Sequence, residues 1–142
     1  MHSGHTWVLF ALLSAFFAGL SYTLAKLGIK NVNSNLAAAI ITTVVSTLSW
    51  IVTFVTGKQN DIVNIEHKSL LFFVLSGTAT GLSWLCFYRA LQLGEASKVI
   101  PVDKFSLVIG MAMAFIILKE PVSAQTIIGG MFITIGMFVL IL

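Results

Sequence analysis

The sequence predicts an all-α integral membrane protein with five transmembrane helices joined by short loops. Of its 142 residues, 58% are hydrophobic and 9% are charged, more apolar surface than a water-soluble domain of this size needs. Long stretches carry no charge on any face, and a helix needs roughly 20 such residues to cross the hydrocarbon core. None of them keeps the alternating pattern of membrane-barrel strands. Lipid is therefore expected to be the solvent for most of the chain.

Each expected helix is bounded by turn-forming or charged residues. The first, 7–28, runs on into YTLAKLGIK and lacks the basic leader of a cleaved signal peptide. The second, 36–56, ends before GKQND, and the third, 70–93, ends before GEAS. The fourth, 98–118, ends at KEP, and the fifth, 122–142, follows Pro121, which fits a first helical turn. Connections this short make neighbouring helices antiparallel, so residues 1–142 are expected to form one five-helix unit.

Basic residues near the helix ends bear on the orientation in the membrane. One face collects five of them, Lys26, Lys30, Arg89, Lys98 and Lys104. The other face collects three, Lys58, Lys68 and Lys119. The positive-inside rule then favours a multi-pass protein of the cytoplasmic membrane with a cytoplasmic C-terminus. The imbalance is small, so insertion of the chain in both orientations stays open.

Polar side chains recur at helical spacing on several helix faces. Ser46 and Ser49 belong to a hydroxyl-bearing stripe of the second helix, while Tyr22, Trp84 and Tyr88 are aromatic residues with polar handles. One interpretation is packing, because serine and threonine hydroxyls bond their own backbone one turn back. The other is a polar cavity that binds a solute.

Glycines occupy the faces on which membrane helices approach one another closely. Five of them are expected to serve helix packing, Gly77, Gly81, Gly110, Gly129 and Gly136.

Asp103 and Lys104 stand side by side near the start of the fourth helix, after Pro101. If this helix begins at Lys98, Pro101 kinks it and the charges lie about 8 to 9 Å along it, as candidates for function. If it begins at Pro101, Asp103 complements the helix terminus and Lys104 snorkels to the interface. Both residues are candidate cavity residues.

The chain resembles the EamA-type unit of the drug/metabolite transporter superfamily, in its short, single-unit bacterial and archaeal branch. FALLSAFFAGLSYTLAKLGIKNV is similar to the opening helix of that unit, and V-D-K-F-S after Pro101 to a pattern recurring in the short branch. The remaining likeness runs through Trp84, Tyr88, Arg89, Ala90, Leu91, Gly94, Ala96, Ser97, Val99, Pro101, Glu120, Gly129 and Gly136.

The resemblance implies half of a transporter, because such units work in pairs of opposite orientation with a cavity near the membrane midplane. We therefore expect a transporter of small metabolites or amphiphilic solutes that acts by alternating access. Its partners would be the lipid bilayer, a small-molecule substrate and a similar five-helix chain, as an antiparallel homodimer or a heterodimer. The alternative is a non-transporting accessory or lipid-binding subunit that packs with a partner membrane protein.

The sequence gives little support to an enzyme, a metal-binding protein or a nucleic-acid-binding protein. No nucleophile stands with a base at useful spacing, so neither an enzyme nor a cofactor is expected. His2 and His5, at the terminus, are the nearest approach to a metal site, and none is predicted. The net charge of +3 gives no reason to expect nucleic acid as a partner.

Overall fold

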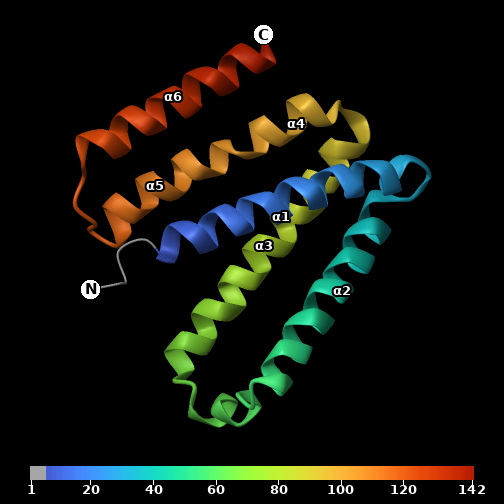
Figure 1. Ribbon diagram of the computed structural model, residues 1–142, viewed down its shortest axis with the longest axis vertical. Helices are drawn as coiled ribbons and strands as arrows, with labels where there is room; N and C mark the ends of the chain where they lie inside the picture. Colours follow the sequence, from blue (N-terminus) through green and yellow to red (C-terminus); the bar gives the residue numbers. More distant parts are fainter. Residues whose placement is uncertain (1–5) are drawn as a thin grey trace. The chain divides into compact units, whose positions relative to one another are not determined.

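The computed structural model describes residues 6–142 as helices joined by short connections (Figure 1). The α-helices are α1 Thr6–Gly28, α2 Ser34–Val55, α3 His67–Leu93, α4 Ala96–Asp103, α5 Phe105–Ile117 and α6 Ala124–Ile141. Two 3-10 helices lie between them, η1 Ile29–Asn31 and η2 Gln59–Asn64. Five stretches are long and apolar enough to span a membrane, Thr6–Asn31, Ser34–Val55, His67–Leu93, Ala96–Ile117 and Ala124–Ile141. The predicted fold class, all-α with five transmembrane helices, is confirmed.

Large apolar side chains are exposed along every spanning stretch. Examples, one from each stretch, are Phe10, Phe54, Phe73, Ile116 and Phe132. In water such exposure forgoes roughly 25 cal/mol for every Å² left unburied, whereas hydrocarbon imposes no such cost. The chain is accordingly a multi-pass membrane protein whose outer faces are covered by lipid or by other membrane helices.

The bounds of some helices differ from the expected ones. Helix α3 begins at His67, three residues before the expected start. Helix α6 begins at Ala124 because Ser123 is its N-cap and accepts a hydrogen bond from the Thr126 N–H at 3.1 Å. The loop expected between the second and third helices contains η2.

The fourth spanning stretch is not one continuous helix. It begins at Ala96, and Pro101 lies inside α4 instead of at a helix start. The break follows at Lys104, whose N–H contacts the carbonyls of Ile100 at 3.3 Å and Pro101 at 3.1 Å. Proline lacks an N–H and crowds the turn before it, whereas this irregular turn lies three residues after Pro101. Asp103 and Lys104 therefore lie at an interruption within a spanning stretch.

The described chain forms two compact units, residues 6–23 with 93–142 and residues 24–92. In the first unit, α6 packs against α4 and α5, the three helices drawn from yellow to red in Figure 1. The turn after α5 contains Lys119, whose φ of 53° is unusual for a residue with a side chain.

Most of the buried residues that the structure describes lie in the second unit. They are Ile29, Ser34, Ala38, Phe87, Tyr88 and Leu91, while Gly130 and Met137 are buried in the first unit. The Lys26 ammonium donates to the Leu91 carbonyl at 2.6 Å, and the Gln92 side-chain amide donates to the Val32 carbonyl at 2.8 Å. These bonds join the C-terminal end of α1 and the segment after η1 to the C-terminal end of α3.

Candidate functional site

A groove of about 580 Å³ lies between α2 and the middle of α3, within the second unit. Its lining combines hydroxyl, small and aromatic side chains. From α2 come Asn35, Ala38, Ala39, Thr42, Thr43, Ser46, Thr47 and Trp50, and from α3 come Gly81, Trp84 and Leu85. Small polar side chains beside two indole rings are typical of a surface that binds a small organic molecule. We call this surface the α2 groove.

Most hydroxyls of the α2 groove are already bonded to their own helix. Thr42, Thr43 and Thr47 each donate to the carbonyl four residues earlier, at 2.6, 2.8 and 2.8 Å. The packing interpretation of the hydroxyl stripe therefore accounts for these threonines. The Ser46 hydroxyl is different, since among the described residues no hydrogen bond holds it.

A second hollow of about 440 Å³ continues along α2 toward η2. It shares Ser46 and Trp50 with the α2 groove. Its remaining lining is Ser49, Thr53, Lys58, Gln59, Asp61, Ile62 and Ile65. We call it the η2 hollow. Ser46 is thus the predicted cavity residue that both surfaces share.

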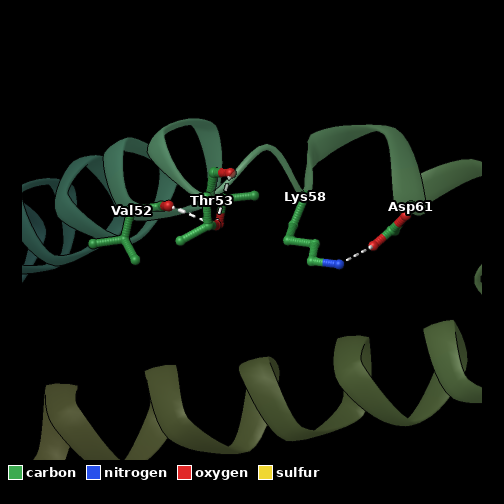
Figure 2. Close-up of polar contacts among 5 residues, drawn as sticks. Val52, Thr53, Lys58 and Asp61 are labelled. Carbon is green, nitrogen blue, oxygen red and sulfur yellow. Dashed lines mark hydrogen bonds and ion pairs between the residues drawn. The ribbon is translucent and has the colours of Figure 1, made fainter.

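An ion pair and an unsatisfied amide mark the η2 hollow. The Lys58 ammonium lies 3.7 Å from the Asp61 carboxylate, just beyond the end of α2 (Figure 2). Both side chains are largely exposed, at 72% and 66%, so the pair is a weak one. The Gln59 Oε1 atom is buried and has no hydrogen-bond partner among the described residues. A buried acceptor without a donor is uncommon in a folded protein.

The two aromatic residues predicted on α3 lie in different surroundings. Trp84 lines the α2 groove. Tyr88 is 5% exposed, and its ring meets those of Trp84 and Phe87 edge-on, at centroid distances of 6.4 and 5.5 Å. Tyr88 lines neither the α2 groove nor the η2 hollow, and its ring packs against that of Trp84. Its contact with a solute stays a prediction.

The other three predicted cavity residues form a polar cluster in the first unit. The Lys104 ammonium donates to the Tyr22 hydroxyl at 2.6 Å, lies 4.6 Å from the centroid of the Tyr22 ring and is 3.4 Å from the Asp103 carboxylate. The Lys104 and Asp103 side chains are 37% and 27% exposed. An ion pair half-buried in a spanning stretch is costly without such partners. The cluster ties α1 to the break between α4 and α5.

The glycines predicted to pack have open space around them. A Cβ atom built at Gly77, Gly81, Gly110, Gly129 or Gly136 would meet nothing within 4 Å. Their predicted role in helix packing stays a prediction. Gly81 instead opens the floor of the α2 groove.

Close approach occurs at Gly130, which the sequence did not single out. A Cβ atom there would lie 3.1 Å from the Met111 methyl carbon. Gly130 also lines an apolar hollow of about 480 Å³ between α5 and α6.

Nothing among residues 6–142 gathers three or more side chains able to hold a metal ion. His2 and His5 lie outside the described residues.

The comparisons with known proteins agree with the membrane fold. Residues 5–142 match the EamA-like transporter family. An uncharacterized transporter in the cobO 3′ region of a Sinorhizobium species is 38% identical over 135 residues, which are 95% of this chain and 96% of that protein. An uncharacterized protein of Methanocaldococcus jannaschii is 27% identical over 135 residues, with the same shares of both chains. No solved structure matches the chain significantly.

Proposed function

Because this chain belongs to the EamA-like transporter family, and is therefore a membrane transporter, we propose that it carries small metabolites or amphiphilic solutes through the α2 groove. One observation carries this proposal: the unbonded Ser46 hydroxyl and the Trp84 indole line the same groove, whose volume is about 580 Å³. Ser46 supplies hydrogen bonds to the solute, Ser49 does so from the adjoining η2 hollow, and the two indoles of the groove supply apolar contact.

The proposed working form is an antiparallel pair of chains in the cytoplasmic membrane, each contributing one five-helix unit over residues 1–142. The α2 groove is open along one side, and a second unit of opposite orientation would close it into a cavity near the membrane midplane. Alternating access would follow from rocking one unit against the other.

Filling the groove tests its role. Gly81→Leu adds a side chain where nothing lies within 4 Å, so the helix accepts it while the groove loses volume. Gly77→Leu is the matched control, because it adds the same side chain to open space one turn earlier, outside the groove. Proteoliposomes are loaded with a metabolite mixture, and mass spectrometry measures what leaves them per assembled protein. We expect Gly81→Leu to abolish solute release and Gly77→Leu to retain it. Equal release from both variants would remove the α2 groove from the transport path.

The polar cluster of the first unit is the second part of the proposal. We propose that transport also requires the pair of Asp103 and Lys104 in the first unit, because the pair orders the break between α4 and α5 through Tyr22. Asp103→Asn keeps the size of the side chain and removes its charge. Transport should fall in this variant while chemical crosslinking still captures the paired chains. Unchanged transport would mean that the cluster only stabilises the fold.

The orientation of the chain decides whether it pairs with itself. Reporters active on only one side of the cytoplasmic membrane are fused after Leu142 in separate strains. Activity of both reporters supports an antiparallel homodimer. Activity of the cytoplasmic reporter alone excludes self-pairing as an inverted repeat and leaves a heterodimer with a similar chain.

A further inference from the structure

The η2 hollow is built to hold a positively charged group, and we propose that it binds the ammonium of a small amine whose apolar body lies against Trp50. This binding does not require transport. It rests on the proposed function only in identifying the bound amine with the transported solute.

The hydroxyl groups of the hollow present oxygen lone pairs to a ligand. The Ser49 hydroxyl donates to the Val45 carbonyl at 2.9 Å, and the Thr53 hydroxyl donates to the Ser49 carbonyl at 2.9 Å. Each proton is thereby used within α2, so each hydroxyl oxygen can only accept from a ligand. A ligand that brings N–H donors fits this surface.

The Gln59 amide adds a further acceptor that lacks a donor. Its Oε1 atom is buried without a hydrogen-bond partner among the described residues. Leaving such an oxygen unsatisfied is unfavourable, and a donor that reaches it would remove that cost. The Trp50 indole N–H and the Gln59 NH₂ group are neutral donors and can serve an uncharged part of the same ligand.

The C-terminal end of α2 also favours a positively charged ligand. This helix of 22 residues has no basic side chain in its last turn, and the C-terminal end of a helix carries a partial negative charge. The carbonyls of Val52 and Thr53 face this end and accept local hydrogen bonds (Figure 2). The Trp50 ring, 47% exposed, offers a face for a cation–π contact.

The remaining charges of the hollow are one carboxylate and one ammonium, those of Asp61 and Lys58. Their 3.7 Å separation and large exposure make the pair easy to open. The ligand ammonium would replace Lys58 beside Asp61. Lys58 therefore competes with the ligand ammonium for Asp61, and Asp61 is the ion-pair partner of the bound ligand. Removing the Lys58 charge should strengthen ligand binding, and removing the Asp61 charge should weaken it.

The probe is 2-phenylethylammonium, with 2-phenylethanol as its neutral counterpart and 3-phenylpropanoate as its anionic one. The full chain is placed in nanodiscs of phosphatidylcholine, and isothermal titration calorimetry measures each dissociation constant after subtraction of empty discs. We expect the ammonium compound to bind roughly fivefold more tightly than either counterpart. Equal or tighter binding of the carboxylate overturns the proposal.

Two neighbouring substitutions give the sharper test. Asp61→Asn should weaken binding of the ammonium probe about three- to fivefold, and Lys58→Gln should strengthen it about two- to threefold. The exposed pair of Lys98 and Glu95, at 4.0 Å and also three residues apart, is the matched control. Glu95→Gln and Lys98→Gln change the net charge equally and should move the dissociation constant less than about 1.5-fold, because neither residue lines the hollow and both side chains are exposed, where salt screens their charges.

Shifts in the same direction for Asp61→Asn and Lys58→Gln overturn the proposal, as do control shifts of equal size. Trp50→Leu provides an independent check. It should weaken binding of the ammonium probe about two- to fivefold and leave binding of the carboxylate probe unchanged. If the Asp61 and Lys58 variants shift binding oppositely but no amine is transported, the site stands and the proposed function fails. If Gly81→Leu blocks transport while both charge variants bind the probe normally, the inference fails and the proposed function stands.

Discussion

The bond between Lys26 and Leu91 gives the most direct test of how the second unit holds together. The Lys26 ammonium lies 2.6 Å from the Leu91 carbonyl, and Leu91 is 0% exposed. Lys26→Met keeps a long, unbranched side chain, one heavy atom shorter, but removes the donor, so the carbonyl near the end of α3 loses a charged partner. A hydrogen bond to a charged group contributes about 1.5 to 3 kcal/mol, while bonds measured between membrane helices average about 0.6 kcal/mol. Because this carbonyl is shielded from water, we expect a loss of about 1.5 kcal/mol in the free energy of unfolding.

Lys30→Met is the matched control for that substitution. Lys30 is exposed, and among the described residues no hydrogen bond or ion pair holds its ammonium. Both variants lose one positive charge close to the same helix end. Unfolding in dodecyl sulfate, followed by far-ultraviolet circular dichroism, should show a lower midpoint for Lys26→Met and an unchanged one for Lys30→Met. Free energies of unfolding that differ by less than about 0.3 kcal/mol between the two variants would refute the reasoning.

Three further predictions concern the first unit, each measured as a change in the same unfolding midpoint. Gly130→Leu should destabilise the fold by about 2 kcal/mol, because a methyl carbon lies 3.1 Å from the Cβ position. Gly129→Leu, in open space, should not destabilise it. Equal effects of the two substitutions would contradict the packing of α5 on α6. Ser123→Ala should cost about 1 kcal/mol through loss of the α6 N-cap, and no change would show that water replaces the cap. Tyr22→Phe should cost about 1 kcal/mol by removing the 2.6 Å bond to Lys104, and a neutral result would reduce that bond to an incidental contact.

Hydrophobic runs predicted the five spans because their length is dictated by the thickness of the bilayer. The interruption at Lys104 was harder to place. Pro101 marks a disturbed helix, but proline is tolerated at a first turn and also produces kinks, so the sequence left both alternatives open. The structure starts the helix at Ala96 and puts the irregular turn three residues after the proline.

The sequence predicts those residues of the candidate site that recur at helical spacing on a long helix. Ser46 and Trp84 follow from the spacing of polar residues on α2 and α3, and both line the groove. Gln59 and Asp61 belong to η2, and residues outside a long helix leave no periodic pattern to detect. For Gly81 the sequence predicts packing and does not indicate a groove, because a glycine that permits close approach and one that opens a groove look alike in sequence.

The position of Ser46 in α2 bears on what covers the groove. Ser46 lies twelve residues after Ser34, the first residue of the helix, which is about 18 Å at 1.5 Å per residue. That depth is close to the middle of a hydrocarbon core about 30 Å thick. A hydroxyl without a partner is unfavourable against lipid chains at that depth, so the groove calls for a polar occupant or a second protein unit. The proposed inverted pair with a solute cavity at the midplane would supply both.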